Sequence, residues 1–275
     1  MSDILMSALF GIENKRFLVI GGGQGMGEAT ATLLARLGAH VAVLDLEPER
    51  SQRVAAALSQ HGGESLAVAC DVTDEMALVA AIDRIEREFG PLDGMATVVG
   101  MAGWSTLIEM TAETWDRDHA RNLRYFFFAA REVAKRLLAR GAPGSIVAVA
   151  SVDGIVSAPN HGAYGAAKAG LINIAKTMAS EWSEQGVRVN VVAPGGIVTP
   201  RIPLGPEDKE RAGMARVPMK RRGTVDDIAK AAAFFLSDMS PYVTGQTLAV
   251  DGGYTANGGF SDKLAAPPQG TIGLP

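Results

Sequence analysis

The chain has 275 residues, of which 47% are hydrophobic and 20% are charged, and its formal net charge is −4. This composition is ordinary for a globular protein with a substantial core, and it gives no reason to expect nucleic acid or an anionic membrane as a partner. No apolar run is long enough to span a bilayer, and residues 1–16 lack the layout of a secretory signal. Cys70 has no second cysteine to pair with, so we expect a cytoplasmic protein.

Short apolar segments alternate along the chain with longer amphipathic segments. The first kind is typical of strands buried on both faces of a parallel sheet, and the second is long enough for crossover helices. We expect strands at Phe17–Ile20, Val41–Leu44, Leu66–Ala69, Met95–Val99, Ser145–Ala150, Val187–Val192 and Thr247–Val250. We expect helices from Gly25, from Glu47, from Asp74, over about Thr111–Arg140, over about Gly162–Glu184, and from Val225. The alternation predicts one α/β domain over residues 1–275, with a Rossmann-like doubly wound sheet of about seven mostly parallel strands and helices on both faces.

Two segments interrupt this alternation. Residues 200–223 are rich in proline, glycine and charge and follow a strand, which favours a mobile flap. The glycine-containing residues 255–275 follow the expected core of about 14–254. We expect this tail to be either frayed or held on a neighbouring subunit.

A glycine cluster follows the first strand and leads into a helix. It comprises Gly21, Gly22, Gly23, Gln24, Gly25, Met26 and Gly27. Glycines let the backbone turn tightly and approach a pyrophosphate, while the start of the helix offers free N–H groups to the anion. A plain tight turn also fits such a cluster, but its place between strand and helix favours a dinucleotide site.

Asp45 ends the second strand, and a carboxylate at this place accepts hydrogen bonds from the adenosine ribose. It would repel a 2′-phosphate, and neither Gln24 nor Leu46 supplies the cation that NADP prefers. The sequence therefore predicts NAD, with Leu46 beside the ribose, although Asp45 could also cap the next helix. Asp71 and Val72 would border the adenine, and Asp71 could equally cap the helix that starts near Asp74.

Further motifs follow in order: Asn122, Ser151, Tyr164-x-x-x-Lys168 and Pro194-Gly195. Together with the G-x-x-x-G-x-G spacing, they make residues 14–254 resemble the compact one-domain branch of the short-chain dehydrogenase/reductase family. The resemblance implies cofactor contacts from Val99, Gly100, Pro194, Gly195, Ile197 and Thr199. The chain departs from the family pattern at Ile20, where a threonine is frequent, and at Thr97-Val98-Val99, where Asn-Asn-Ala is usual.

Tyr164 and Lys168 are four residues apart and share one face of a helix. The lysine ammonium and the charge of an oxidised nicotinamide are expected to lower the pKa of the tyrosine toward 7, which takes about 4 kcal/mol. Such a tyrosine can take or donate the alcohol proton. A surface Tyr/Lys pair is the plain alternative, and Ser151, able to orient the substrate oxygen, favours the catalytic interpretation.

The resemblance implies two further roles at this site. Lys168 would bind the nicotinamide ribose, and Asn122 would distort its helix and hold a water that links the lysine to solvent. A surface asparagine is the alternative for Asn122.

We therefore expect an NAD-dependent oxidoreductase that interconverts a small secondary alcohol and a ketone without a metal. Asp153, His161 and Gly196 are candidate substrate contacts. The aromatic residues 125–128, together with the resemblance, predict a homotetramer or homodimer, although burial in the core of the chain itself would also account for them. The alternatives are a non-catalytic NAD-binding sensor or scaffold, an NADP-preferring carbonyl reductase, and a nucleotide-sugar epimerase or dehydratase.

Overall fold

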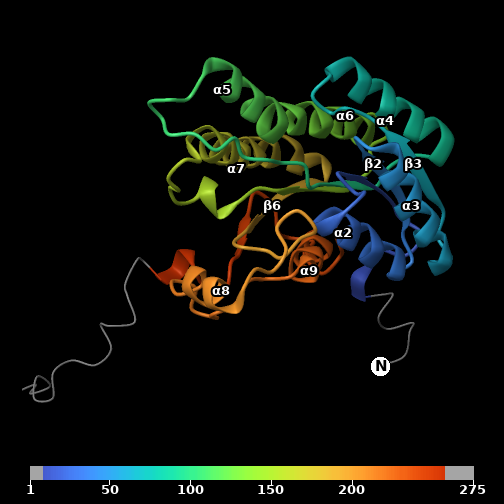
Figure 1. The fold of residues 1–275 in the computed structure, drawn as a ribbon. Coiled ribbons are helices and arrows are strands. Elements are labelled where there is room, and N and C mark those ends of the chain that lie inside the picture. Colours follow the sequence, from blue (N-terminus) through green and yellow to red (C-terminus); the bar gives the residue numbers. More distant parts are fainter. Residues whose placement is uncertain (1–8, 258–275) are drawn as a thin grey trace, which may run out of the picture.

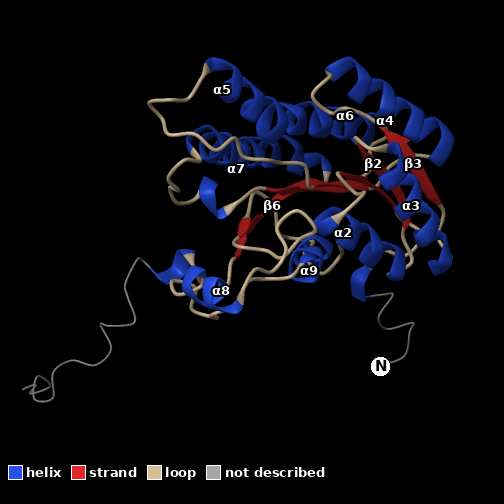
Figure 2. Ribbon diagram, viewed as in Figure 1, coloured by secondary structure: helices blue, strands red, loops and turns tan. Residues whose placement is uncertain are grey.

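A computed structural model describes residues 9–257 of the chain. Seven strands form one sheet in the order β3-β2-β1-β4-β5-β6-β7, and every neighbouring pair is parallel (Figures 1 and 2). The strands are β1 (Arg16–Ile20), β2 (His40–Asp45), β3 (Ser65–Ala69), β4 (Gly94–Thr97), β5 (Gly144–Val149), β6 (Val187–Pro194) and β7 (Thr247–Val250). The predicted doubly wound parallel sheet is confirmed.

Helices cover both faces of the sheet (Figure 1). The helices of the described residues are α2 (Gly25–Arg36), α3 (Pro48–Leu58), α4 (Glu75–Phe89), α5 (Ala112–His119), α6 (Tyr125–Ala139), α7 (Gly162–Trp182), α8 (Glu207–Gly213), which lies away from the sheet, and α9 (Val225–Leu236). Side chains of β1 alternate between the two cores, with Leu18 and Ile20 toward α4, α6 and α7, and Phe17 and Val19 toward α2, α3 and α9. Both faces of the strand are therefore buried, which is why its sequence is almost wholly apolar.

The helix predicted over Thr111–Arg140 is interrupted at its middle. α5 and α6 are joined by η2, a π-helical turn over Ala120–Arg124 that contains Asn122. The Nδ2 atom of Asn122 donates to the backbone oxygen of Asp118 at 2.9 Å, one turn earlier. The asparagine thus bonds the helix backbone where the ladder changes from α-helical to π-helical.

Several boundaries differ from the sequence predictions. β4 ends at Thr97, two residues early, because the next carbonyls leave the sheet: Val99 O accepts from the Tyr125 hydroxyl at 3.0 Å. Asp71 does not cap α4; it is exposed and binds Thr73, while Asp74 accepts from Ala77 N at 3.1 Å.

The two segments outside the regular alternation are described in part. Residues 200–223 contain the short helix α8, and their expected mobility stays a prediction. Most of the predicted tail, residues 258–275, lies outside the described residues.

Candidate active site and cofactor site

The glycine loop joins β1 to α2 and lies against the end of β2. Gly21 N and Gly22 N both donate to Leu44 O, at 2.7 and 3.1 Å. A Cβ atom on Gly27 would lie 2.0 Å from Gly21 O, so only glycine lets the helix start this close to the loop. The predicted residues Gln24 and Met26 lie at this helix start, where Gln24 is the N-cap.

Gly25 leaves open the space at the start of α2. Its φ is +59°, and a Cβ atom on it would point toward Thr199 Cβ and Pro200 Cδ, at 3.9 and 3.6 Å. The absent side chain therefore leaves a cradle between the helix start and the segment after β6. Free N–H groups and the positive end of the helix dipole fit a pyrophosphate there.

Asp45 braces the glycine loop from the end of β2. Its Oδ2 accepts from Gly23 N at 2.9 Å, and its Oδ1 accepts from Glu47 N at 3.2 Å. The N-cap of α3 is Glu47, without a side-chain cap bond, so the suggestion that Asp45 caps this helix is wrong. Each carboxylate oxygen has a second lone pair that can accept from a ribose hydroxyl. Leu46, next to it, is exposed.

Two arginines beside the glycine loop were not singled out from the sequence. Arg53 Nη2 donates to Gly23 O at 2.9 Å, and Arg53 also forms an ion pair with Glu28 at 2.7 Å. The Cβ of Arg50 lies 2.7 Å from where a Gly23 Cβ would stand. The two arginines are three residues apart on the helix that follows Asp45, so they share one face of it. This spacing is the signal that could have pointed to both of them at the glycine loop.

The remaining predicted cofactor residues follow the ends of other strands at the same sheet edge. Val72 is buried and Asp71 exposed after β3. The other members of this group are Val99 and Gly100 after β4, and Pro194, Gly195, Ile197 and Thr199 at and after the end of β6. Parallel strands bring their carboxyl ends to one edge, so the structure brings these residues together with the glycine loop.

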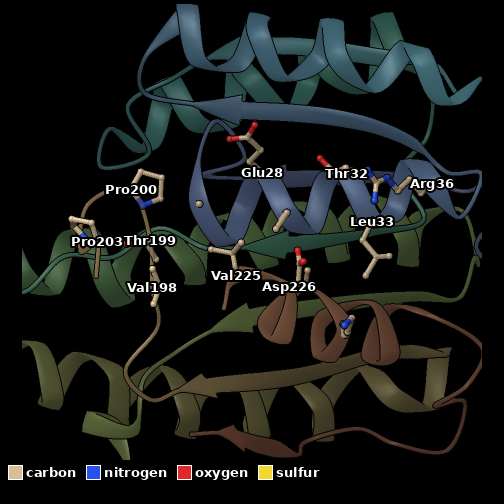
Figure 3. Close-up of a pocket in the computed structure, with 14 residues that line it drawn as sticks. Glu28, Thr32, Leu33, Arg36, Val198, Thr199, Pro200, Pro203, Val225 and Asp226 are labelled. Carbon is tan, nitrogen blue, oxygen red and sulfur yellow. The ribbon is translucent and has the colours of Figure 1, made fainter. Parts of the chain in front are cut away.

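A groove of about 720 Å³ runs between α2 and α9 (Figure 3). Of the predicted cofactor residues only Gly25 and Thr199 line it; its other lining residues include Glu28, Arg36, Asp226 and Lys230. The groove therefore meets the predicted cofactor site at one end only.

The catalytic candidates converge where β5 ends and α7 begins. Ser151 follows β5, and its Oγ accepts from Asp153 N at 3.1 Å in the short turn η3 (Val152–Gly154). Lys168 Nζ lies 5.7 Å from the centroid of the Tyr164 ring. It donates to Val149 O at 3.0 Å, and the side chain is almost fully buried. The pair therefore faces the site, and the surface alternative is wrong.

Asn122 is fully buried beside the lysine, so the surface alternative fails for it too. Its Nδ2 donates to Met101 O at 2.9 Å, and its Oδ1 accepts from Met101 N at 3.2 Å. A Cβ on Gly100 would lie 2.8 Å from Asn122 Oδ1 and 3.0 Å from Lys168 Nζ. Gly100 thus allows both polar groups to approach the same point.

Burial dominates the electrostatics of the tyrosine and the lysine. It raises the pKa of Tyr164 to about 12, opposed in part by a hydrogen bond with Ser151, while the charges of Asp153 and Asp118 raise it further. It lowers the pKa of Lys168 to about 7. The lowering expected from the lysine together with an oxidised nicotinamide stays a prediction, and in the chain alone burial acts in the opposite direction. Both groups favour their neutral forms, because charge is costly away from water.

The predicted substrate residues lie around Tyr164. His161 Nδ1 is 2.6 Å from Asp153 Oδ2, and the rings of His161 and Tyr164 are 5.8 Å apart. Within the described residues, the buried Nε2 of His161 has no hydrogen-bond partner. On the flap side, Met214 Cε lies 3.7 Å from the Cβ position of Gly196.

Two neighbours of the site were missed in the sequence. The Trp104 ring stands edge-on to His161 at 4.1 Å and is largely exposed. Asp118 is fully buried, and its Oδ2 accepts from Gly103 N at 2.8 Å. Asp118 lies one helical turn before Asn122, and this spacing could have identified it from the sequence. No signal in the sequence indicates Trp104.

Within residues 9–257, no group of three or more histidine, cysteine, aspartate or glutamate side chains could hold a metal ion. In the same part of the chain, no helix is long and apolar enough to cross a membrane.

Known proteins resemble the chain over most of its length. A family model described as enoyl-(acyl carrier protein) reductase matches residues 21–255. The 2-(S)-hydroxypropyl-CoM dehydrogenase 3 of Xanthobacter autotrophicus is 38% identical over 252 residues, 89% of this chain and 98% of that protein. A protein of the same organism named inactive 2-(S)-hydroxypropyl-CoM dehydrogenase 2 is 39% identical over 82% of this chain and 99% of its own. A solved short-chain type dehydrogenase/reductase from Mycobacterium marinum has a TM-score of 0.84 at 28% identity, covering 92% of this chain and 99% of that one.

Proposed function

Because the chain belongs to the short-chain dehydrogenase/reductase family, we propose that it is an NAD-dependent oxidoreductase that interconverts a secondary alcohol and a ketone. One arrangement carries the proposal: the Ser151 hydroxyl acts on the pKa of the Tyr164 phenol, and Lys168 Nζ lies 5.7 Å from the centroid of the same ring. Binding a dinucleotide requires neither the serine nor the tyrosine, whereas proton transfer at a carbonyl oxygen uses both.

A bound nicotinamide supplies or accepts the hydride. In reduction, the Tyr164 hydroxyl donates its proton to the substrate oxygen, and in oxidation Tyr164 takes it back. Ser151 would orient that oxygen beside the phenol, and Lys168 would donate to the ribose of a bound nicotinamide cofactor. Asn122 and Lys168 both lie beside Gly100, and a water held between them would exchange the proton with solvent.

NAD is the proposed cofactor because the Asp45 carboxylate lies against the glycine loop, where it disfavours a 2′-phosphate. A second candidate, an NADP-preferring carbonyl reductase, is favoured by Arg50 beside Gly23. Fluorescence titration with NADH and NADPH separates the two. Tighter binding of NADPH would contradict the first.

The proposed substrate is a small secondary alcohol or ketone of modest hydrophobicity. The relative from Xanthobacter is named for a hydroxypropyl compound, which is a secondary alcohol. Trp104 supplies an apolar wall and the His161–Asp153 pair a polar one, with Gly196 under the flap. The negative charges of Asp118 and Asp153 act on Tyr164, and they would disfavour an anionic group beside the reacting oxygen.

The test is a panel of secondary alcohols with NAD, read as formation of reduced cofactor, with wild type and Tyr164→Phe. Wild type should turn over at least one alcohol, and the variant should lose at least 100-fold in kcat while binding NADH as before. Near-normal turnover by the variant contradicts the mechanism. NADH binding without turnover of any alcohol favours the non-catalytic alternative, which the name of the inactive relative makes concrete.

The proposal includes a cytoplasmic location and a homotetramer or homodimer. Tyr125 and Phe126 are fully buried in their own core, so they do not support an interface. Phe127 and Phe128 are partly buried, and Arg131 lies 4.8 Å from the Phe128 ring. Light scattering at several protein concentrations tests the assembly, and a monomer throughout would contradict it.

A further inference from the structure

We propose that Arg201 is a further cofactor-binding residue, which clamps the dinucleotide pyrophosphate against the start of α2. This inference rests on the proposed function, because it assumes that a dinucleotide binds at the glycine loop. It adds a side chain from the flap to the predicted pyrophosphate site, whose other donors are backbone N–H groups.

A tight turn presents Arg201. Thr199 N donates to Ile202 O at 3.2 Å, and Ile202 N donates to Thr199 O at 3.0 Å and to Thr199 Oγ1 at 3.1 Å. Pro200 occupies the second position of this turn, where its fixed φ is favourable, and Arg201 occupies the third. The arginine therefore stands at the tip of a closed turn.

Arg222 holds that turn in place from below. Its Nη2 donates to Ile202 O at 2.8 Å and also to Ile197 O, and its Nη1 donates to Pro203 O at 3.1 Å. The Arg222 side chain is only 9% exposed. The base of the turn is thus tied to Ile197, one of the predicted cofactor contacts.

The tip of the turn lies over the glycine loop. Atoms of Thr199 and Pro200 lie nearest to the point where a Cβ on Gly25 would stand. Figure 3 shows both residues beside the end of α2 that carries Glu28. When the Gln24 amide is oriented so that its oxygen faces the flap, the orientation that satisfies both groups, this oxygen accepts from Arg201 Nε at 2.9 Å and from Nη2 at 3.2 Å. The guanidinium therefore reaches the N-cap residue of α2.

The charge of Arg201 is unusual for its surroundings. The neighbouring arginines of the flap and its base pair with carboxylates: Arg211 with Glu207, Arg221 with Asp227, and Arg222 with Glu210. Among the described residues, Arg201 bonds only a neutral amide, and Glu28 on the first turn of α2 is taken by Arg53.

An uncompensated cation at the positive end of a helix dipole is unfavourable. A bound anion between the Arg201 guanidinium and the start of α2 would replace this repulsion by attraction to both. The planar guanidinium suits two phosphate oxygens at once. A pyrophosphate is the anion that the glycine loop is shaped to take.

The experiment measures binding rather than turnover. NADH fluorescence gives Kd for wild type, Arg201→Gln, Arg201→Lys and the control Arg211→Gln, which removes the same charge from the same flap. ADP-ribose, which contains the pyrophosphate, and adenosine, which lacks it, then compete against NADH. Circular dichroism confirms that each variant is folded.

We expect Arg201→Gln to weaken NADH and ADP-ribose about 10-fold or more, the range for a hydrogen bond to a charged group, and to leave adenosine unchanged. Arg201→Lys should recover part of the loss, and Arg211→Gln should bind as wild type does. The inference is overturned if Arg201→Gln binds ADP-ribose as tightly as wild type does, or if its affinity for adenosine falls by the same factor as its affinity for ADP-ribose. In either case the arginine would only fasten the flap to Gln24. Wild type that binds no dinucleotide overturns the proposed function as well.

Discussion

Lys168→Met should make the stability difference between variant and wild type depend on pH. Burial lowers the pKa of Lys168 to about 7, from the usual value of 10.5. Between these two values the unfolded chain binds more protons than the folded chain, so the free energy of unfolding of the wild type rises with pH. The loss of stability caused by burying the Lys168 amine is absent above the pKa of this amine in the unfolded chain. It is complete below the pKa of this amine in the folded chain.

The two pKa values fix the magnitude. At 1.36 kcal/mol per unit, the buried amine costs the folded wild type roughly 2 kcal/mol at pH 9 and between about 4 and 5 kcal/mol at pH 6. Methionine has no proton to gain or lose. The stability of Lys168→Met relative to wild type should therefore increase by about 2–3 kcal/mol as pH falls from 9 to 6. The titration of Tyr164, with its pKa raised to about 12, lies above this window.

Urea unfolding followed by circular dichroism at several pH values measures this difference, at one protein concentration so that any assembly contributes equally. Lys176→Met is the control, because Lys176 is an exposed lysine on the same helix. A difference between Lys168→Met and wild type that stays constant from pH 9 to pH 6 would refute the reasoning.

Three further outcomes are expected. Gly27→Ala should lower Tm and abolish NADH binding, because its Cβ would lie 2.0 Å from Gly21 O; Gly213→Ala, where a Cβ meets nothing within 4 Å, should do neither. Thr224→Ala should cost about 1 kcal/mol in urea unfolding, since Thr224 and Asp227 form a capping box at the start of α9, and an unchanged midpoint would contradict it. Arg222→Ala should speed limited proteolysis after residue 200, because Arg222 bonds Ile202 O and Pro203 O; an unchanged cleavage rate would show that the turn holds without it.

Periodicity alone was enough to predict the sheet, because burial on both faces leaves apolar segments such as Val41–Leu44 with little variation in type. Strand ends were harder, since they depend on where a carbonyl leaves the ladder. Val99 O is taken by the Tyr125 hydroxyl, a contact between residues 26 positions apart. Spacing along the chain carries no information on such a contact.

The site residues follow the same division. Tyr164 and Lys168 could be paired from their helical spacing, whereas Asn122 and Ser151 were joined to them through the resemblance to the family. Arg201 and Trp104 could not be found in either way, because loops set their positions. Gln24 and Arg201 are 177 positions apart and meet only through the turn after β6.

The pKa of Tyr164 is raised and that of Lys168 is lowered, and sequence spacing alone could not predict these directions. Four residues on a helix guarantee proximity, but the effect of an ammonium on a phenol depends on whether the amine is charged at all. Desolvation acts on both groups and leaves a gap of about 5 pKa units between them. Moving the proton from the phenol to the amine then costs about 7 kcal/mol before their mutual attraction is counted. The chain alone therefore holds Tyr164 in its protonated form, the form that donates a proton in the proposed reduction. In the proposed oxidation, proton uptake by Tyr164 would depend on the positive charge that an oxidised nicotinamide brings beside it.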